Sequence, residues 1–216
     1  YVLKKIVKDS SFTILGDLCQ GIHSYRGVRQ WDEIVENVFE GKKCEFLTLE
    51  QSYRTTVEIM EAANNVMGKI KSLAMYRGKP VIRHGDPVEY IQVETFDETV
   101  MKISERISEF INEGYKTIAV ICKTMEECQR ILPYLKKDHK DISLITGNEK
   151  EYKSGIVIVP SYLSKGLEFD GVLLSNVNRE NYTESELDTK LLYVAMTRPL
   201  HKLCIYYVGE KSTLLE

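Results

Sequence analysis

The sequence has none of the features that mark a specialised class of protein. Its 216 residues include only 13 Gly and 5 Pro, too few for a collagen-like or low-complexity chain. No stretch approaches the ~18 consecutive apolar residues of a membrane-spanning helix, because the longest mainly apolar runs are only as long as a strand. The first residues carry no signal-peptide pattern. We therefore expect a soluble cytoplasmic protein with no membrane partner.

Cysteine, histidine and charge exclude further kinds of site. The five Cys form an odd set without a CxxC pair, and the four His are scattered, so the sequence indicates neither a disulfide framework nor a metal site. The 29 basic residues are fewer than the 32 acidic ones, which gives a net charge of −3. This balance excludes nucleic-acid binding through an overall basic surface, although it permits a local basic groove.

The glycine-rich loops that bind nucleotides in many proteins are also missing. The sequence contains no G-x-x-x-x-G-K-[ST] and no G-x-G-x-x-G, so it has neither a phosphate-binding P-loop nor a dinucleotide fingerprint. The chain starts without Met and in the middle of a structural pattern. We therefore expect it to be a segment of a longer protein.

What the sequence does contain is a regular alternation of apolar runs and amphipathic segments. The spacing of apolar residues predicts helices over residues 30–39, 55–67, 97–112, 125–137 and 184–196. It predicts strands over residues 12–15, 46–49, 88–93, 117–122, 142–145, 156–159, 171–175 and 202–207. These strands are too apolar for a sheet with one face in water. The pattern therefore predicts an α/β fold in one main domain, with helices on both faces of a mostly parallel sheet.

Loops at the strand ends are the candidate binding segments, because open parallel sheets bind ligands beyond the carboxyl ends of their strands. Two of these loops hold an arginine: Arg54 lies between a strand and a helix, and Arg198 between a helix and a strand. Two guanidinium groups on one face would suit a polyphosphate, since each can bind phosphate oxygens in a fork and neutralise their charge. Most arginines at strand ends only form salt bridges or face solvent, so the residue pattern alone leaves both interpretations open.

Four short motifs in these loops resemble a helicase family. They occupy residues 16–20, 51–56, 165–170 and 192–198, with the sequences GDLCQ, QSYRTT, KGLEFD and LYVAMTR. In kind and order they are similar to motifs III, IV, V and VI of the UvrD/Rep-type superfamily 1 DNA helicases. The resemblance implies a RecA-like second motor domain (2A) over residues 28–216, lacking a P-loop of its own. Residues 1–27 would be the tail of the first motor domain, ending in the motif III strand and loop.

The resemblance implies a catalytic role for three residues at an ATP site between the two motor domains. Arg54 corresponds to the motif IV arginine that contacts the γ-phosphate. Arg198 corresponds to the motif VI arginine, which acts as an arginine finger. Gln20 corresponds to the motif III glutamine, which senses the γ-phosphate and links it to the nucleic-acid track. The P-loop and the residues that hold Mg²⁺ would lie upstream, in the first motor domain.

The same resemblance implies contacts to the rest of the nucleotide. Tyr53 corresponds to the aromatic residue that packs beside the base, and Glu168 to the motif V glutamate that reaches the ribose hydroxyl. Lys165 and Gly166 shape the motif V loop, although a lysine there can equally be a solvated surface charge.

Aromatic and basic residues are expected to contact the nucleic acid. Tyr25 stands where the family has an aromatic residue that stacks on single-strand bases, an interaction worth ~1–3 kcal/mol per base. The alternative for this residue is a half-buried core tyrosine. His23 and Arg26 flank it and are within reach of phosphates. Tyr162 is a further candidate for stacking.

Motif V departs from the usual family pattern. Pro160 and Tyr162 occupy the positions of a Thr and a His that touch DNA in the family. This form resembles the helicase IV branch and its relatives, which include a motor that removes RNA polymerase from DNA. The interval between Arg54 and Pro160 is also too short for the large 2B insertion of UvrD.

Two functions follow from the resemblance. The first is the C-terminal half of an ATP-dependent DNA helicase that moves 3′→5′ on single-stranded DNA, with its N-terminal motor domain as the other partner. The alternative is an ATP-driven factor of the same family that remodels or recycles RNA polymerase. Both a DNA-repair and a transcription role stay open. A small-molecule enzyme has no nucleophile, His–acid pair or cofactor loop to support it. The segment alone is expected to be inactive, because it holds one side of the ATP site.

Overall fold

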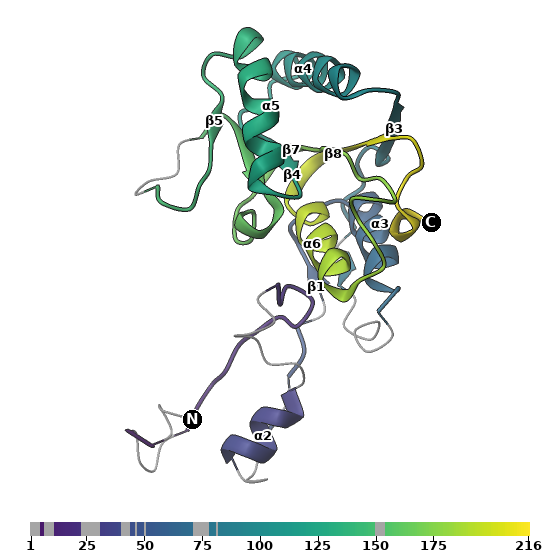
Figure 1. The fold of residues 1–216 in the computed structure, drawn as a ribbon. Helices are drawn as coiled ribbons and strands as arrows, with labels where there is room; N and C mark the ends of the chain where they lie inside the picture. The colour runs from purple at the N-terminus through teal and green to yellow at the C-terminus, as the bar shows by residue number, and fades with distance from the viewer. Residues whose placement is uncertain are drawn as a thin grey trace.

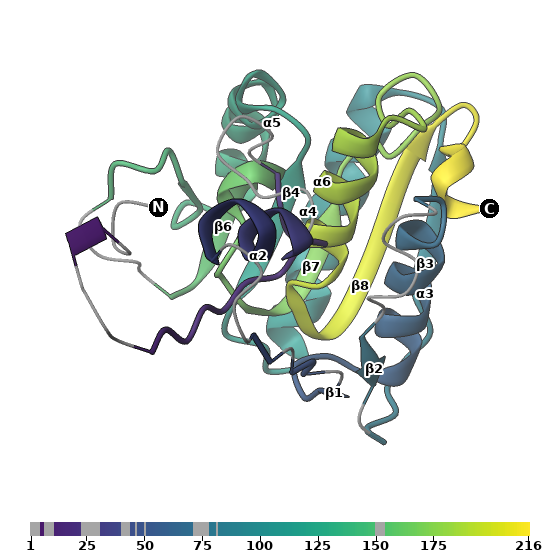
Figure 2. The same cartoon turned by 90° about the horizontal axis from the view of Figure 1, so that it is seen from below.

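A six-stranded parallel sheet forms the centre of the protein in the computed structural model (Figure 1). The structure describes residues 5–6, 11–22, 31–39, 44–45, 47–49, 51–70, 78–80, 82–149 and 154–216. Across the sheet the strands follow the order β3, β8, β7, β4, β6, β5, and every neighbouring pair is parallel. Figure 2 shows most of this order from below. The strands are β3 (Glu89–Val93), β4 (Ile118–Cys122), β5 (Ser143–Leu144), β6 (Ile156–Pro160), β7 (Phe169–Leu174) and β8 (Pro199–Val208).

Four helices cover the two faces of this sheet, as the sequence predicts. Two pack on one face and two on the other, so the protein has three layers (Figure 1). The first pair is α4 (Phe96–Asn112) and α5 (Met125–Asp138), and the second is α3 (Val57–Met67) and α6 (Glu186–Met196). Short 3₁₀ turns follow β6 and β8, namely η2 (Ser161–Leu163) and η3 (Thr213–Leu215). The α/β architecture with a parallel sheet is therefore confirmed.

The central strand β4 shows why the strand sequences are continuously apolar. All five of its residues are buried. Because side chains alternate across a strand, Ile118 and Val120 pack into the core under α4 and α5, whereas Ala119 and Ile121 pack into the core under α3 and α6. A strand covered on both faces requires apolar residues at both phases of the alternation.

Hydroxyl side chains fix where the helices begin. Thr56, Thr95 and Ser185 each accept a hydrogen bond from a backbone N–H in the first turn of α3, α4 and α6. Helix α5 starts with a full capping box, in which Thr124 and Glu127 satisfy each other's backbone N–H groups. Caps of this kind stabilise a helix by about 1 kcal/mol.

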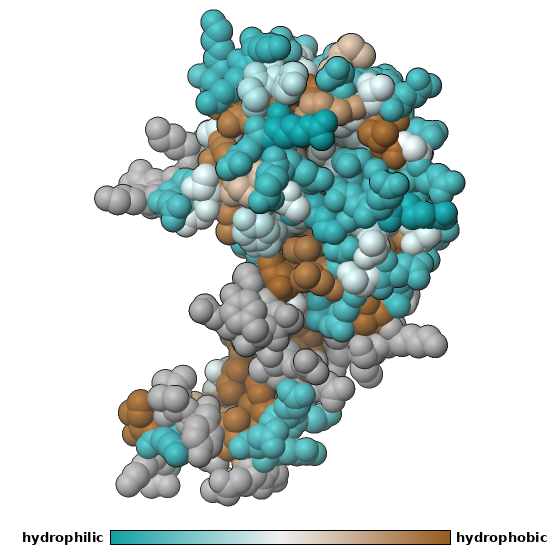
Figure 3. All heavy atoms as spheres, viewed as in Figure 1, coloured by the Kyte–Doolittle hydropathy of each residue, from teal (hydrophilic) through white to brown (hydrophobic). Residues whose placement is uncertain are grey.

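The first described residues and helix α2 (Trp31–Phe39) extend away from the sheet, whereas Cys19 and Ile22 pack into the core on the side of α3 and α6 (Figure 1). Helix α2 has no buried residue. The strand predicted over residues 12–15 is wrong, because these residues are irregular and find no partner strand among the described residues. Ile14 and Leu15 are exposed instead, and Figure 3 shows apolar surface on these N-terminal segments.

A second strand prediction is displaced in the structure. Residues 47–49, from the run predicted to form a strand, are not in one. The strand lies further along, as β1 (Gln51–Ser52), and pairs in parallel with β2 (Lys79–Pro80) in a separate small sheet. Leu47 and Leu49 are exposed, and no described strand pairs with them. No helix in the described part of the chain has the length and apolar character needed to cross a membrane.

Candidate functional site

Arg198 is the best-defined polar side chain at the predicted site. It connects the end of α6 to the first residue of β8 and is fully buried. Its Nε donates to the carbonyl of Val194 at 2.8 Å, and its Nη2 donates to Oγ1 of Thr197 at 3.0 Å. Two longer bonds of 3.4 Å run from Nη1 to the carbonyl of Leu167 and from Nη2 to Oε1 of Gln20. The two short bonds hold the guanidinium to its own helix, and the two long ones join it to other segments.

The surroundings of Arg198 favour a negative charge close to its guanidinium group. Burial, followed by the nearby positive charge of Arg54, lowers the pKa of Arg198 to about 10, against the opposing effect of Glu168. The group stays protonated near neutral pH. A buried cation beside a second cation is poorly stabilised by its surroundings, and an anion bound there would relieve both effects.

Arg54 lies next to Arg198 but is held much more loosely. Its loop connects β1 to α3, and its Nε donates to Oε1 of Glu168 at 2.5 Å. The two side chains are 37% and 46% exposed. An ion pair in contact with water is worth at most about 1 kcal/mol, so a ligand can separate the two groups at little cost.

The segment at residues 16–20 brings Gln20 to the same place. Asp17 orients it, because its Oδ1 accepts the backbone N–H of Cys19 at 2.9 Å and its Oδ2 accepts Nε2 of Gln20 at 2.7 Å. The Gln20 carbonyl accepts Nζ of Lys165 at 2.8 Å. Gln20 therefore touches both Arg198 and the motif V loop, although it is 178 residues away from Arg198 in the sequence.

The predicted edge of the sheet is wrong for this cluster. Glu168 and Arg198 immediately precede β7 and β8, so they lie at the amino ends of these strands. In the six-stranded sheet only the start of the motif V segment, at Pro160, lies at a carboxyl end, and Arg54 follows β1 of the separate small sheet. The physical reason is that β6 and β7 are both parallel to β4, so the chain that joins them must cross from one edge to the other.

Two further residues expected at the nucleotide have distinct environments. The Tyr53 side chain is 72% exposed, and its hydroxyl donates to Oε1 of Gln51 at 2.9 Å, which leaves the ring accessible. Gly166 adopts φ +87°, a left-handed conformation that favours glycine. It turns the motif V loop between Lys165 and the buried start of β7.

Of the four expected nucleic-acid residues, only Tyr162 is among the described residues. His23, Tyr25 and Arg26 lie outside the described residues. Tyr162 is half-buried and packs against the core between the sheet and α6. Part of the Tyr162 ring is therefore buried against the core.

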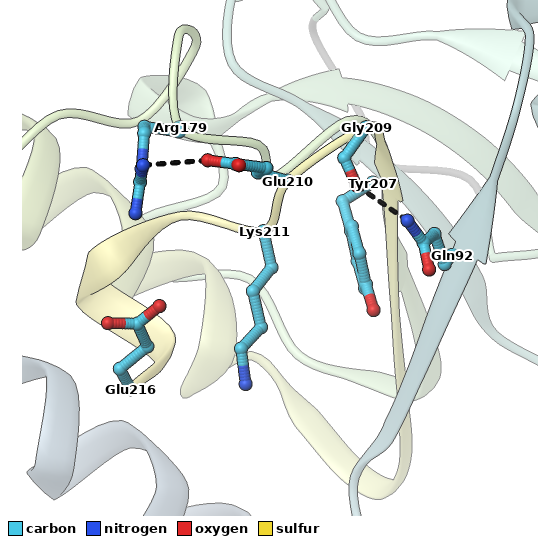
Figure 4. A pocket seen from close by; sticks show the side chains of 7 residues that line it. All are labelled: Gln92, Arg179, Tyr207, Gly209, Glu210, Lys211 and Glu216. Atoms are coloured by element: carbon cyan, nitrogen blue, oxygen red, sulfur yellow. Dashed lines mark hydrogen bonds and ion pairs between the residues drawn. The ribbon is translucent and has the colours of Figure 1, made fainter.

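A polar hollow at the carboxyl ends of β3 and β8 offers a different kind of surface (Figure 4). It lies where parallel sheets usually bind ligands. Its arginine, Arg179, is paired with Glu210 at 2.7 Å, and Gln92 donates to the carbonyl of Gly209 at 2.8 Å. These groups already satisfy one another. The residues that line the hollow include no pair of adjacent arginines like Arg54 and Arg198 at the amino edge of the sheet. The residues that line it are Gln92, Arg179, Tyr207, Gly209, Glu210, Lys211 and Glu216.

Sequence reasoning missed one residue next to the site, Arg83. It lies in the turn-rich segment after α3 and donates from Nη2 to the carbonyl of Arg54 at 3.0 Å. The same atom donates to the carbonyl of Leu200, close to Arg198. An isolated arginine between Ile82 and His84 gives no signal in the sequence, because its partners lie 29 and 117 residues away.

The parallel α/β fold resembles that of a helicase C-terminal domain, and comparison with known proteins identifies the family. Residues 47–152 and residues 155–206 match two family descriptions that carry the same wording, UvrD-like helicase C-terminal domain. The chain belongs to the UvrD-like helicase C-terminal domain family. This confirms the resemblance to UvrD/Rep-type superfamily 1 helicases drawn from the four motifs.

Two relatives illustrate the match. The ATP-dependent DNA helicase PcrA of Leuconostoc citreum is 26% identical over 165 residues, which cover 73% of this chain and 21% of PcrA. The crystal structure of the C-terminal domain of a possible DNA helicase from Lactobacillus plantarum superposes with a TM-score of 0.62 at 29% identity. That match covers 76% of this chain and 92% of the crystallised domain. The chain thus spans about a fifth of its curated relative and most of the crystallised domain.

Proposed function

We propose that this chain is the second motor domain of an ATP-dependent superfamily 1 DNA helicase or translocase that moves 3′→5′ along single-stranded DNA. The observation that carries the proposal is the juxtaposition of Arg198, Arg54 and Gln20 at the amino edge of the sheet. Two guanidinium groups and an amide that meet at one point supply the donors that a triphosphate requires.

The lengths of the hydrogen bonds suggest how the cluster responds to ATP. The two short bonds of Arg198, to Val194 and Thr197, keep its guanidinium in place. The 3.4 Å bonds to Leu167 and Gln20 are the weaker ones, so phosphate oxygens would replace them first. Loss of the hydrogen bond between Gln20 and Arg198 would then couple binding of the γ-phosphate to the position of residues 16–20.

Arg54 and Glu168 would respond to the nucleotide together. The γ-phosphate competes with Glu168 for the Arg54 guanidinium, and the freed carboxylate can accept a ribose hydroxyl. The exposed ring of Tyr53 would pack beside the base.

Mg²⁺ and the P-loop belong to another part of the protein. The cluster described here consists mainly of donors, and no group of three His, Cys, Asp or Glu side chains suited to a metal ion occurs among the described residues. When bound, Mg²⁺ would neutralise phosphate charge. We propose that the first motor domain supplies its ligands, that residues 1–27 are the end of that domain, and that residues 28–216 are the second, without a 2B insertion. By itself this segment would not hydrolyse ATP.

A second candidate function is the ATP-driven remodelling of RNA polymerase. The observation that favours it is the motif V segment, where Pro160 completes β6 and Tyr162 packs against the core. Ser161 is also buried, and its hydroxyl donates to the carbonyl of Cys122 at 3.1 Å. This segment therefore offers fewer free groups to a DNA strand than the usual Thr and His would.

The ATPase activity of the full-length protein discriminates between the two functions. We expect single-stranded DNA to stimulate hydrolysis at least ~10-fold, because closing the motor domains on DNA completes the ATP site. The measurement is steady-state ATPase with and without single-stranded DNA, and separately with RNA polymerase. Stimulation by polymerase alone would favour the second function. Hydrolysis by residues 1–216 alone would contradict the assignment as half of a motor.

A further inference from the structure

Residues 83–86 form a strap between the two arginine-bearing segments of the site. On one side this strap contacts the start of α3, just after Arg54, and on the other it contacts the start of β8, just after Arg198. We propose that Arg83 is a positioning residue that fixes the location of Arg54 relative to Arg198. This inference rests on the proposed role of the two arginines in ATP hydrolysis.

The bonds of Arg83 are the first line of evidence. One atom, Nη2, donates to the carbonyl of Arg54 at 3.0 Å and also to the carbonyl of Leu200. The Arg83 carbonyl accepts the backbone N–H of Val57 at 3.0 Å, at the first residue of α3. In the described part of the chain Arg83 is the sole donor to the Arg54 carbonyl. Without the Arg83 side chain, the loop that carries Arg54 would lose this hydrogen-bonded link to β8.

The geometry of β8 explains why Leu200 is available to Arg83. Strands β7 and β8 pair at Phe169 with Pro199 and again at Gly171 with Lys202, so β8 contains one extra residue over this interval. A bulge of this kind leaves backbone groups outside the regular ladder. Arg83 satisfies the carbonyl of Leu200 at this irregular point, immediately after the segment that carries Arg198.

The rest of the strap holds Arg83 in place. Glu58 in the first turn of α3 binds Nδ1 of His84 at 2.8 Å and accepts the backbone N–H of Gly85 at 2.9 Å. Asp86 forms an ion pair with Lys202 of β8. The strap is thus tied to both segments at positions beyond Arg83 itself.

Close packing fixes how near the strap lies to α3. A Cβ atom at Gly85 would lie 2.6 Å from Cγ2 of Thr56, the N-cap residue of α3. Such a distance is too short for two carbon atoms, so any larger residue here must push the strap away from the helix. Glycine is required at this position by the contact.

Substitution of Arg83 in the full-length protein tests the proposal. We expect Arg83→Met to lower kcat for DNA-stimulated ATP hydrolysis about 10-fold or more, because small displacements of catalytic groups are costly. The Kd for ATP should change less than about threefold, since the nucleotide is held mainly by the P-loop side. Arg83→Lys keeps a donor within reach of both carbonyls and should restore most of kcat.

Arg106→Met is the matched control for stability. Arg106 is also a partly buried arginine, and it binds Glu89 at 2.7 and 3.1 Å on the α4 side of the sheet. Its loss should lower the thermal stability without lowering kcat. If Arg83→Met retains the kcat of the wild type, or if Arg106→Met loses as much kcat, the positioning role is overturned.

A second pair of variants tests the strap without removing Arg83. Gly85→Ala should displace the strap from Thr56 and lower kcat, and adding Thr56→Ser should restore it. The serine removes the clashing Cγ2 while keeping the hydroxyl that caps α3. If the double variant regains the thermal stability of the wild type but not its kcat, the proposal is contradicted. If Arg198→Ala itself leaves hydrolysis intact, the proposed function fails, whatever the result at Arg83.

Discussion

Replacement of Arg198 by alanine in the full-length protein is expected to abolish ATP turnover. An arginine that stabilises the charge of a transferring phosphoryl group contributes ~10³–10⁵ in kcat, so a loss of at least about 10³-fold should follow. Binding of ATP should stay within a few-fold of the wild type, because the P-loop side of the site is untouched. Steady-state ATPase together with fluorescent-nucleotide binding measures the two quantities separately.

The burial of Arg198 calls for companion variants that leave the fold intact. Arg198→Lys keeps the charge and should preserve stability better than alanine, but it loses the forked geometry and should recover little of kcat. Arg54→Ala removes a guanidinium proposed to contact the γ-phosphate and should lower turnover. Its exposed ion pair contributes little to stability, so the melting temperature should not fall. Hydrolysis that survives Arg198→Ala within a few-fold would contradict the arginine-finger role.

Gly171→Ala is expected to destabilise the domain by ~1–3 kcal/mol through overpacking. A Cβ atom here would lie 2.6 Å from two carbon atoms of the Phe110 ring, which is itself fully buried. Neither β7 nor α4 can easily move, because both are packed in the core. Urea denaturation of the wild type and the variant measures the difference in the free energy of unfolding.

The companion substitution Phe110→Leu makes this test specific. Alone it should destabilise the domain, because it leaves a cavity beside Gly171. Combined with Gly171→Ala it should cost less than the sum of the two single changes, with a coupling of at least ~0.5 kcal/mol. Additive effects would show that the clash with Phe110 is not the source of the instability.

The fold could be predicted largely because its central elements have strong local signals. Strand β4 is apolar throughout, and the next helix begins with the capping pair Thr124 and Glu127, so both are evident from the sequence. The failures lie where pairing partners decide the outcome. Residues 12–15 have the composition of a strand, but composition cannot tell whether a neighbouring strand exists.

The site was predictable only as far as its motifs extend. Arg54, Arg198 and Gln20 were each assigned through resemblance, and the structure places them together. The edge of the sheet predicted for them was wrong, because the sequence does not show that the motif V segment crosses from the carboxyl end of β6 to the amino end of β7. Arg83 could not be found, since its bonds reach backbone carbonyls, which every residue possesses.

That crossing has a mechanical consequence. Eight residues, 161–168, join the end of β6 to the start of β7. Three of them form η2, and the next four form a turn in which the Leu167 N–H donates to the Ser164 carbonyl at 3.1 Å. Local hydrogen bonds therefore order most of this connection. Leu163 and Leu167 anchor it to the core. Because this short connection is hydrogen-bonded within itself and anchored at two points, we expect a displacement of Ser161 to shift Glu168, which binds Arg54.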